Sequence, residues 1–431
     1  MGEIKGGILM RLKKVAALSL AAAMLLGSLT GCGNKKGNDT PSTSNPTADA
    51  SNPIDVELLV WTPAEDQAED KGCYIQTVCQ KFNEAHPEWN ITFTYGVCSE
   101  ADAGNLVAQD PSASADVYCF ANDQLGKLID ANAIAKLGGS VAEYVKSTNS
   151  QSMVDTISVN GDVYGVPYEI NTWFMFYDKS VFTEEDVKSL DKMLAKAKIS
   201  FPLTNSWYIA SFFVGNGCTF FGDGTDEAAG IDFSGTKASD VTKYLVNLAA
   251  SPNFLNDAGG AGIAALRDGT VAAYFSGSWD APNVKTILGE NFGVAALPTF
   301  TINGEEKQLK SFAGSRAVGV NPNCKYPQVA TALAQYLGSE EAQKLHYELR
   351  NTVPTNTTLL ADAAYTSDPV AVAQQNTFLK TSIIQPFVSR MGYYWATAEN
   401  FGKAIMSGEV TLENAESKAE DLNTALNTVL E

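Results

Sequence analysis

The chain has 431 residues, of which 45% are hydrophobic and 18% are charged, the composition of an ordinary globular protein with room for two or more domains. Its formal net charge of −19 at pH 7 argues against nucleic acid and anionic membrane surfaces as partners, because both repel an acidic protein. This charge suits a soluble protein that binds neutral or cationic ligands.

The first 31 residues have the pattern of an export signal. The basic stretch RLKK at 11–14 precedes an apolar run at 15–29 that is too short to span a membrane. The run closes on LTGC, which resembles a bacterial lipobox, whose cysteine receives a diacylglycerol and becomes the new N-terminus. We therefore predict a lipoprotein signal peptide at 1–31 and lipidation of Cys32. The alternative is a plain secretory signal with an accidental cysteine.

The stretch that follows the signal has no folding pattern. Residues 32–53 are polar, rich in Ser, Thr, Pro and Asn, and lack hydrophobic periodicity, which predicts a disordered tether. One lipid on an N-terminal cysteine anchors a protein without spanning the bilayer. The prediction is a body held on the extracellular face of the cell membrane, in a Gram-positive bacterium.

The folded part opens with an alternation of strand and helix patterns. The strands are expected at 54–63, 90–97 and 115–121, with helices at about 74–86 and 123–132. This βαβαβα order predicts a parallel sheet covered by helices, with a ligand crevice outside the carboxyl ends of its strands.

The rest of the chain continues the α/β pattern. Strands are expected at 292–300 and 311–321, and helices at 326–349 and 413–430. We therefore predict two α/β lobes between which the chain crosses more than once. The N-terminal lobe would hold 54–169 and about 317–352, and the C-terminal lobe 170–316 and about 353–431.

Signals of an enzyme are thin. The chain has two histidines, His86 and His346, and no motif of a metalloprotease, a phosphate-binding loop, a nucleophile elbow or a dinucleotide site. The acidic stretch at 222–232 lacks the spacing of a calcium loop and reads as a surface turn. We predict no catalytic residue, no metal and no cofactor. Adjacent Glu65 and Asp66 leave a glycoside hydrolase open, since that chemistry needs two carboxyl groups.

Six cysteines remain after Cys32. Their spacing is irregular and no C-x-x-C occurs, so we predict mostly free, buried thiols. They are Cys73, Cys79, Cys98, Cys119, Cys218 and Cys324.

Aromatic residues carry the strongest functional signal. Several stand at the ends of predicted strands or in loops beside polar groups: Trp61, Phe120, Trp173, Trp207, Trp279 and Trp395. The apolar face of a sugar ring stacks on an aromatic plane, while its hydroxyl groups need polar partners. For each residue taken alone, the alternative is an ordinary core position.

The stretch MGYYWATAENF at 391–401 shows how the two readings divide. Apolar residues at offsets of three and four predict a buried helix stripe of Met391, Tyr394, Ala398, Phe401 and Ile405. Ser389 is expected as the N-cap. Trp395 lies at the edge of this stripe, so the pattern allows either a residue at the border of the core or an exposed platform. Tyr393 lies off the stripe.

Five segments together resemble the family-1 extracellular solute-binding lipoproteins of sugar ABC transporters, and among them the maltodextrin-binding proteins. The resemblance covers about 54–431. The segments are DVYCFANDQLGKL, NGDVYGVPYEINTWFMFYDKSVF, DGTVAAYFSGSWD, FGVAALPTF and MGYYWATAENFGKAIMSGEVTLENAESKAEDLNTAL. The resemblance implies a periplasmic-binding-protein-like fold of type II, with a ligand cleft between two lobes and three hinge crossovers.

The resemblance also implies ligand contacts at matching positions. Stacking positions fall on Phe120, Trp207, Trp279 and Trp395, and polar contacts on Glu65, Asp66, Asp123, Gln124 and Asn171. Trp61, Trp173, Asp280 and Tyr394 adjoin these and complete the predicted binding set. Asp66, Gln124 and Asn171 stand where the maltodextrin-binding proteins carry Lys, Arg and Glu, so identical sugar contacts are not implied.

The implied function is capture of an oligosaccharide, most simply a maltooligosaccharide, and its delivery to the permease subunits of an ABC importer. The protein is expected to act as a monomer without catalysis. Three alternatives stay open: a binder of another oligosaccharide, a surface glycoside hydrolase and a glycan-sensing lipoprotein.

Overall fold

The predicted opening strand is present as β1 (Ile54–Thr62) in the computed structural model, which describes residues 51–428. It pairs in parallel with β2 (Trp89–Val97) and with β3 (Val117–Ala121), so the predicted parallel pairing of these three strands is confirmed. The predicted signal peptide, Cys32 and most of the predicted tether lie outside the described residues. Within the described range, no helix is long and apolar enough to cross a membrane.

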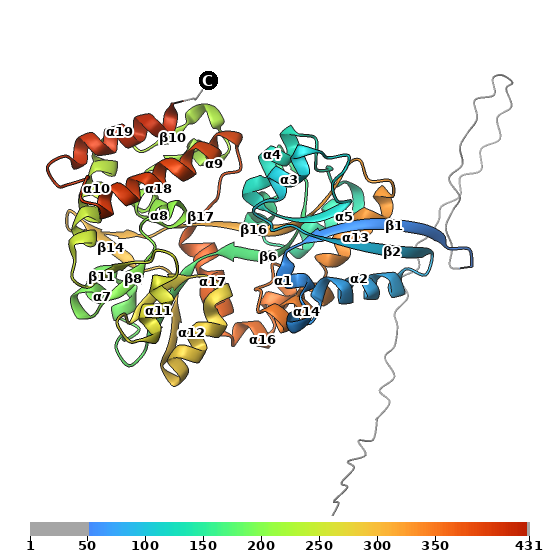
Figure 1. Ribbon diagram of the computed structural model, residues 1–431, viewed down its shortest axis with the longest axis horizontal. Helices are drawn as coiled ribbons and strands as arrows, with labels where there is room; N and C mark the ends of the chain where they lie inside the picture. Colours follow the sequence, from blue (N-terminus) through green and yellow to red (C-terminus); the bar gives the residue numbers. More distant parts are fainter. Residues whose placement is uncertain (1–50, 429–431) are drawn as a thin grey trace, which may run out of the picture. The chain divides into compact units, whose positions relative to one another are not determined.

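Three further strands extend this first sheet. β16 (Ser311–Val320) lies antiparallel to β3 and to β6 (Val166–Thr172), and β17 (Ser382–Ile384) pairs in parallel with the start of β16. The order is β17-β16-β3-β1-β2, with β6 also on β16. Figure 1 shows β6 and β16 running between two groups of helices.

A second sheet forms from the middle of the chain, in the order β11-β8-β12-β7-β13. β7 starts two residues after β6 ends and pairs antiparallel with both of its neighbours. The strands are β7 (Phe174–Asp178), β8 (Ile199–Phe201), β11 (Phe254–Asn256), β12 (Ala273–Ser276) and β13 (Phe292–Ala295).

Helix ends follow local chemistry, as α14 (Glu340–Arg350) illustrates. The side chain of Ser339 accepts a hydrogen bond from the backbone N–H of Ala342. Acidic residues occupy the first turn and Arg350 the last, and both placements are favourable to the helix dipole.

The other longer helices are α2 (Tyr74–Ala85), α3 (Ala103–Gln109), α4 (Leu125–Asp130), α5 (Gly139–Thr148), α7 (Leu190–Lys196), α8 (Ser206–Gly215), α10 (Gly235–Ala250), α11 (Ala261–Arg267), α12 (Ala281–Leu288), α13 (Pro327–Leu337), α17 (Pro369–Lys380), α18 (Gly392–Met406) and α19 (Ala415–Asn427).

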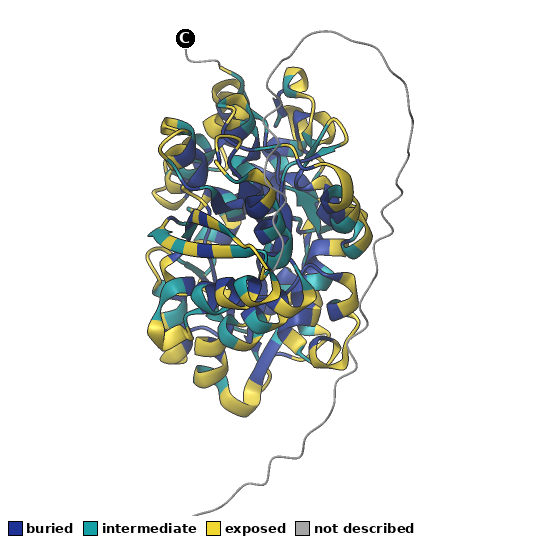
Figure 2. Ribbon diagram, turned by 90° about the vertical axis from the view of Figure 1, so that its right-hand side faces the viewer, coloured by how far each residue is buried: buried dark blue, intermediate teal, exposed yellow. Residues whose placement is uncertain are grey.

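Two large hydrophobic cores lie in the described chain, and Figure 2 shows their buried elements in dark blue. The N-terminal core packs around β1 and β3 and includes Val60, Phe82 and Leu333. The C-terminal core packs around the second sheet, α8, α10 and α18, and includes Trp173 and Phe201. Each core takes residues from both halves of the sequence, as the two-lobe prediction requires.

The chain passes from one core to the other along β6 and β16. Phe312 near the start of β16 belongs to the C-terminal core, whereas Ala317 and Val318 belong to the N-terminal core. A small separate cluster, which includes Ile170, Ala313 and Val353, lies where these passages meet the segment after α14. The exact lobe boundaries that we predicted from the sequence stay predictions.

The predicted stripe of α18 is confirmed: Met391, Tyr394, Ala398, Phe401 and Ile405 are all buried. Helix α18 begins at Gly392, after a short 3-10 turn, and has no side-chain cap. The prediction that Ser389 is the N-cap is therefore wrong. The hydroxyl of Ser389 instead donates a hydrogen bond to the carboxylate of Asp130, over 2.6 Å.

The prediction of free thiols is also confirmed for the described cysteines. All six are unpaired, and five of them are buried. Burial raises the pKa of Cys98 to about 11 and that of Cys79 to about 12, so these thiols stay protonated at neutral pH.

Candidate binding site

A cavity of about 350 Å³ lies where the two cores and the strands that join them meet. Its lining residues come from eight separate stretches of the chain. They are Ala101, Ala121, Asp123, Asn171, Trp207, Trp279, Arg316, Gln385 and Trp395.

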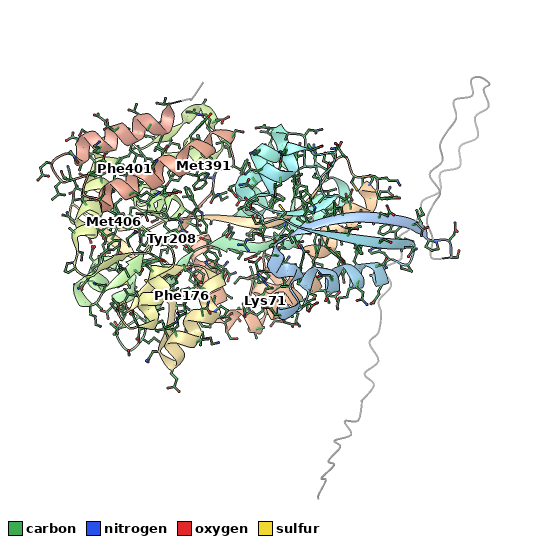
Figure 3. All side chains as sticks on the ribbon, viewed as in Figure 1. Lys71, Phe176, Tyr208, Met391, Phe401 and Met406 are labelled. Carbon is green, nitrogen blue, oxygen red and sulfur yellow. The ribbon has the colours of Figure 1, made fainter. Side chains whose placement is uncertain are left out.

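Three tryptophans give this cavity an apolar side, and all three belong to the part of the chain that carries the C-terminal core. Trp207 is in the first turn of α8, Trp279 in a 3-10 turn after β12, and Trp395 in the first turn of α18. Figure 3 labels Tyr208, which follows Trp207 in the sequence, and Met391, which directly precedes α18.

The tryptophan rings are arranged as platforms. The centroids of Trp207 and Trp279 are 6.2 Å apart, with 31° between their planes. Trp395 packs edge-on against Phe312, with 6.0 Å between centroids. Trp279 is 46% exposed, whereas the other two tryptophans are half-buried against the C-terminal core. The three tryptophans are therefore packed on their surroundings to different degrees while all line the cavity.

Polar groups occupy the rest of the lining. Asp123 follows β3, Asn171 is on β6, Arg316 is on β16, and Gln385 comes directly after β17. Asp123 follows a strand of the first sheet that packs in the N-terminal core. Asn171, Arg316 and Gln385 lie on or next to the strands that join the two cores. Burial raises the pKa of Asp123, an effect partly offset by the hydrogen bond that Gln124 donates to its carboxylate.

Arg316 is the only cation among the described lining residues. Its Nη1 lies 3.1 Å from a carboxylate oxygen of Glu169 and 3.6 Å from one of Glu100. The hydroxyl of Tyr168 also donates to Glu100, over 3.0 Å. Burial would lower the pKa of Arg316, but the two carboxylates outweigh that effect and raise it. Burial raises the pKa of Glu169, and Arg316 partly offsets that increase.

Five of the thirteen predicted contacts line the cavity: Asp123, Asn171, Trp207, Trp279 and Trp395. The structure brings them together although they are spread over more than 270 residues of sequence. Whether they contact a ligand stays a prediction.

Three of the predicted aromatic contacts have fully buried side chains, and their contact with a ligand stays a prediction that this burial does not support. Phe120 belongs to the N-terminal core, and Trp173 and Tyr394 belong to the C-terminal core; all three are 0% exposed. Trp173 packs on Phe201 and Tyr208, and Tyr394 lies beside Trp395 with 5.2 Å between ring centroids. The strand and helix stripes that hold these rings face inward, so their contribution is packing.

Asp66 is also buried and paired, and its contact with a ligand stays a prediction. It is 2% exposed, and its carboxylate lies 3.0 Å from Nε2 of His346 and 3.7 Å from Nε of Arg350, both in α14. His346 in turn stacks on Tyr74, with 4.0 Å between ring centroids. Burial alone would raise the pKa of Asp66, but His346 and Arg350 outweigh it and lower the pKa. The contacts of Asp66 with His346 and Arg350 therefore connect α1 (Ala64–Gln67) to α14.

The remaining four predicted residues do not line this cavity, and their contact with a ligand also stays a prediction. Trp61 is half-buried over Gly96, and Glu65 is exposed. Gln124 supports the neighbouring aspartate. One carboxylate oxygen of Asp280 accepts hydrogen bonds from the hydroxyls of Tyr274 and Ser276, at 2.7 and 2.6 Å.

Sequence reasoning missed four lining residues. Ala101 and Ala121 carry no chemical signal. Arg316 does carry one, as the single charge in the ten-residue strand β16, and so does Gln385, a polar residue between Ile384 and Pro386. Both signals are visible only once these segments are read as strands that pass along a cavity.

A cavity between two α/β cores, with aromatic platforms on one side and polar groups on the strands that join the cores, defines a two-lobed solute-binding protein. The comparison with known families agrees. Residues 77–373, more than half of the chain, match the model of the bacterial extracellular solute-binding proteins, and the chain belongs to that family. Membership in a family of binding proteins agrees with our prediction that the chain is not an enzyme.

Individual relatives cover nearly the whole chain. The galactooligosaccharide-binding protein of Bacillus subtilis (strain 168) is 25% identical over 95% of this chain and 96% of its own. The maltooligosaccharide ABC transporter solute-binding lipoprotein of Streptococcus pneumoniae serotype 4 is 26% identical over the same shares. A solved structure described as "with acarbose" is 52% identical, covers 86% of this chain and 98% of its own, and has a TM-score of 0.82.

Proposed function

We propose that this protein is the solute-binding component of an ABC importer and captures oligosaccharides, with maltooligosaccharides as its ligands. The observation that carries the proposal is the division of the cavity between three tryptophans and a set of polar groups. A pyranose ring presents an apolar C–H face to an aromatic plane and hydroxyl groups to polar partners. Few other small solutes need both at once over the length of several rings.

The mechanism follows from which part of the fold carries each group. Trp207, Trp279 and Trp395 stack on the sugar rings from the C-terminal core. Asp123 accepts hydrogen bonds from sugar hydroxyls on the other side, because an ionised carboxylate is an acceptor only. The amide of Asn171 both donates and accepts. Only a closed arrangement makes all these contacts together, so ligand shifts the population toward closure.

The choice of maltooligosaccharide rests on the relatives. The pneumococcal relative is named for maltooligosaccharide and the 52% identical chain was solved with acarbose, whose rings are α-linked. The Bacillus subtilis relative is named for galactooligosaccharide, so a galactosyl ligand is the competing specificity within the same function.

The proposal includes delivery of the sugar at the outer face of the cell. Cys32 would carry the lipid and residues 32–53 would tether the body to the membrane of a Gram-positive cell, where the monomer meets its permease subunits. Support comes from the lipobox-like LTGC and from the pneumococcal relative, which is named as a lipoprotein of an ABC transporter.

A glycoside hydrolase is the competing class, and the lining argues against it. Such enzymes place two carboxyl groups on either side of the scissile bond. Among the described residues that line the cavity, Asp123 is the only carboxylic acid. Glu169 and Glu100 are not among the lining residues and are paired with Arg316.

Titration calorimetry with maltotriose, maltotetraose and a galactooligosaccharide tests the proposal, with chromatography of the sugar afterwards. We expect saturable binding of the two α-glucans and recovery of the intact sugar. Binding of the galactosyl sugar alone would replace the specificity and keep the class. Cleaved products, or no response to any of the sugars, would remove the proposed function. Loss of maltotetraose uptake on deletion of the gene would separate transport from sensing.

A further inference from the structure

The backbone of Gln385 is fixed on two sides. It is 7% exposed and precedes Pro386, which keeps its backbone extended. Its N–H donates to the carbonyl of Ala313 over 2.8 Å, and its own carbonyl accepts from Nδ2 of Asn122 over 3.3 Å. Ala313 is on β16 and Asn122 follows β3. The side chain therefore starts from a point held by the crossing strand and by the N-terminal sheet.

From that fixed point the side chain reaches one platform ring. Nε1 of Trp207 donates to Oε1 of Gln385 over 2.7 Å. An indole N–H is a donor only, so it needs an acceptor when it is half-buried. Trp207 also packs perpendicular to Tyr208, with 5.6 Å between centroids. The hydrogen bond fixes the remaining rotation of the indole about its Cβ–Cγ bond.

The orientation of this ring matters because Trp207 is one half of a pair. The planes of the two rings differ by 31°, and both tryptophans line the cavity. A sugar chain that runs across both rings gains stacking at two units only if the planes stay so aligned. Trp279 is exposed, so the hydrogen bond on Trp207 is the firmer constraint on the pair.

We propose that Gln385 is a positioning residue for sugar recognition: it acts through Trp207, whose ring plane it sets, rather than through its own contact with the sugar. The inference rests on the proposed function, since it concerns the affinity for oligosaccharide. It also links the N-terminal sheet, through Asn122 and Gln385, to a platform on the C-terminal core.

The test compares Gln385→Met, which removes the acceptor at similar volume, with Gln385→Glu, whose carboxylate still accepts from the indole N–H. Gln80→Met, at an exposed glutamine of α2, is the matched control. Maltotetraose affinity is measured by calorimetry, and the indole N–H signals by ¹H–¹⁵N NMR. Trp207→Phe identifies the Trp207 signal by its disappearance and serves as the background for a double-mutant cycle.

We expect Gln385→Met to weaken maltotetraose binding about tenfold and to shift the Trp207 signal. Gln385→Glu should stay within about threefold of the original protein, as should Gln80→Met. In the Trp207→Phe background, Gln385→Met should cost nothing further, because there is no indole N–H left to orient.

Two outcomes overturn the inference while the proposed function stands. One is a Gln385→Met protein that binds like the original. The other is a loss of affinity that persists in full in the Trp207→Phe background, which would mean that Gln385 contacts the sugar itself. An original protein that binds none of the oligosaccharides overturns the proposed function first, and this measurement precedes the variants.

Discussion

Gly277 lies directly beneath the ring of Trp279: a Cβ at position 277 would come within 2.0 Å of Cζ3 of the indole. The backbone of Gly277 has φ −105° and ψ −174°, an extended conformation that any residue adopts. Position 277 therefore requires a glycine because of the indole ring above it, and not because of its own backbone conformation.

Gly277→Ala should displace the Trp279 ring and weaken maltotetraose binding about tenfold, or ~1.4 kcal/mol. The free energy of unfolding should change little, because the ring is 46% exposed and can turn into solvent. Calorimetry and urea unfolding measure the two effects. Gly138→Ala is the control, since a Cβ there meets nothing within 4 Å. Unchanged affinity would show that Trp279 does not need this orientation.

Trp173 and Trp279 should separate stability from binding. Trp173 is 0% exposed in the C-terminal core, so Trp173→Ala should lower the free energy of unfolding by ~3–5 kcal/mol. Trp279→Ala should leave stability nearly unchanged and lower the binding free energy by ~1–3 kcal/mol. Urea unfolding and calorimetry on both variants check this. A Trp279→Ala protein that unfolds readily but binds normally when folded would reverse our assignment.

How far the sequence predicted this site is seen in its tryptophans. Periodicity placed Tyr394 in a buried stripe and left Trp395 at its edge. In the structure Tyr394 is fully buried and Trp395 is half-buried against the C-terminal core. Strand ends were less informative: Trp173 and Phe120 stand at such ends and are core residues. A period of two shows which side of a strand a residue is on, but not which side another element covers.

The polar part of the site was harder to predict, because it depends on long-range pairing. Arg316 is opposite Glu169 in the β6–β16 register, and Glu100 comes from a third segment. Asp66 illustrates the same limit, since its partner His346 is 280 residues away. Two groups so far apart in sequence give no local pattern, and only the fold shows that they pair.

The pairing of Asp66 should make the protein sensitive to acid. Its folded-state pKa is lowered below the ordinary value of 3.8, so its stabilising contribution is fully present above 3.8 and is lost as pH falls through the folded-state pKa. Asp66→Asn should destabilise the protein by ~3–5 kcal/mol at neutral pH, because a buried pair is broken.

Urea unfolding of both proteins between about pH 6 and pH 3 measures that contribution as a difference. We expect the difference to hold down to about pH 4 and to shrink below it. Glu65→Gln, at the exposed neighbouring carboxyl group, should cost little at any pH. Folded Asp66→Asn should still bind maltotetraose; a large loss of affinity without loss of stability would restore Asp66 as a ligand contact.

Arg316 should have two roles that a double variant can separate. Arg316→Met leaves the buried carboxylates of Glu169 and Glu100 without their cation, so the free energy of unfolding should fall by ~3–5 kcal/mol. It also removes the only cationic donor among the described residues that line the cavity, so sugar affinity should fall as well. Adding Glu169→Gln removes one uncompensated charge and should recover part of the stability.

The same addition cannot restore a donor to the cavity, so the double variant should stay weak in binding. Thermal unfolding and maltotetraose calorimetry on the single and double variants measure the two roles, with Arg267→Met, at an exposed arginine of α11, as the control. If affinity recovers together with stability, Arg316 acts only by holding the strands β6 and β16 in place. If stability recovers while affinity stays low, its guanidinium is part of the sugar site.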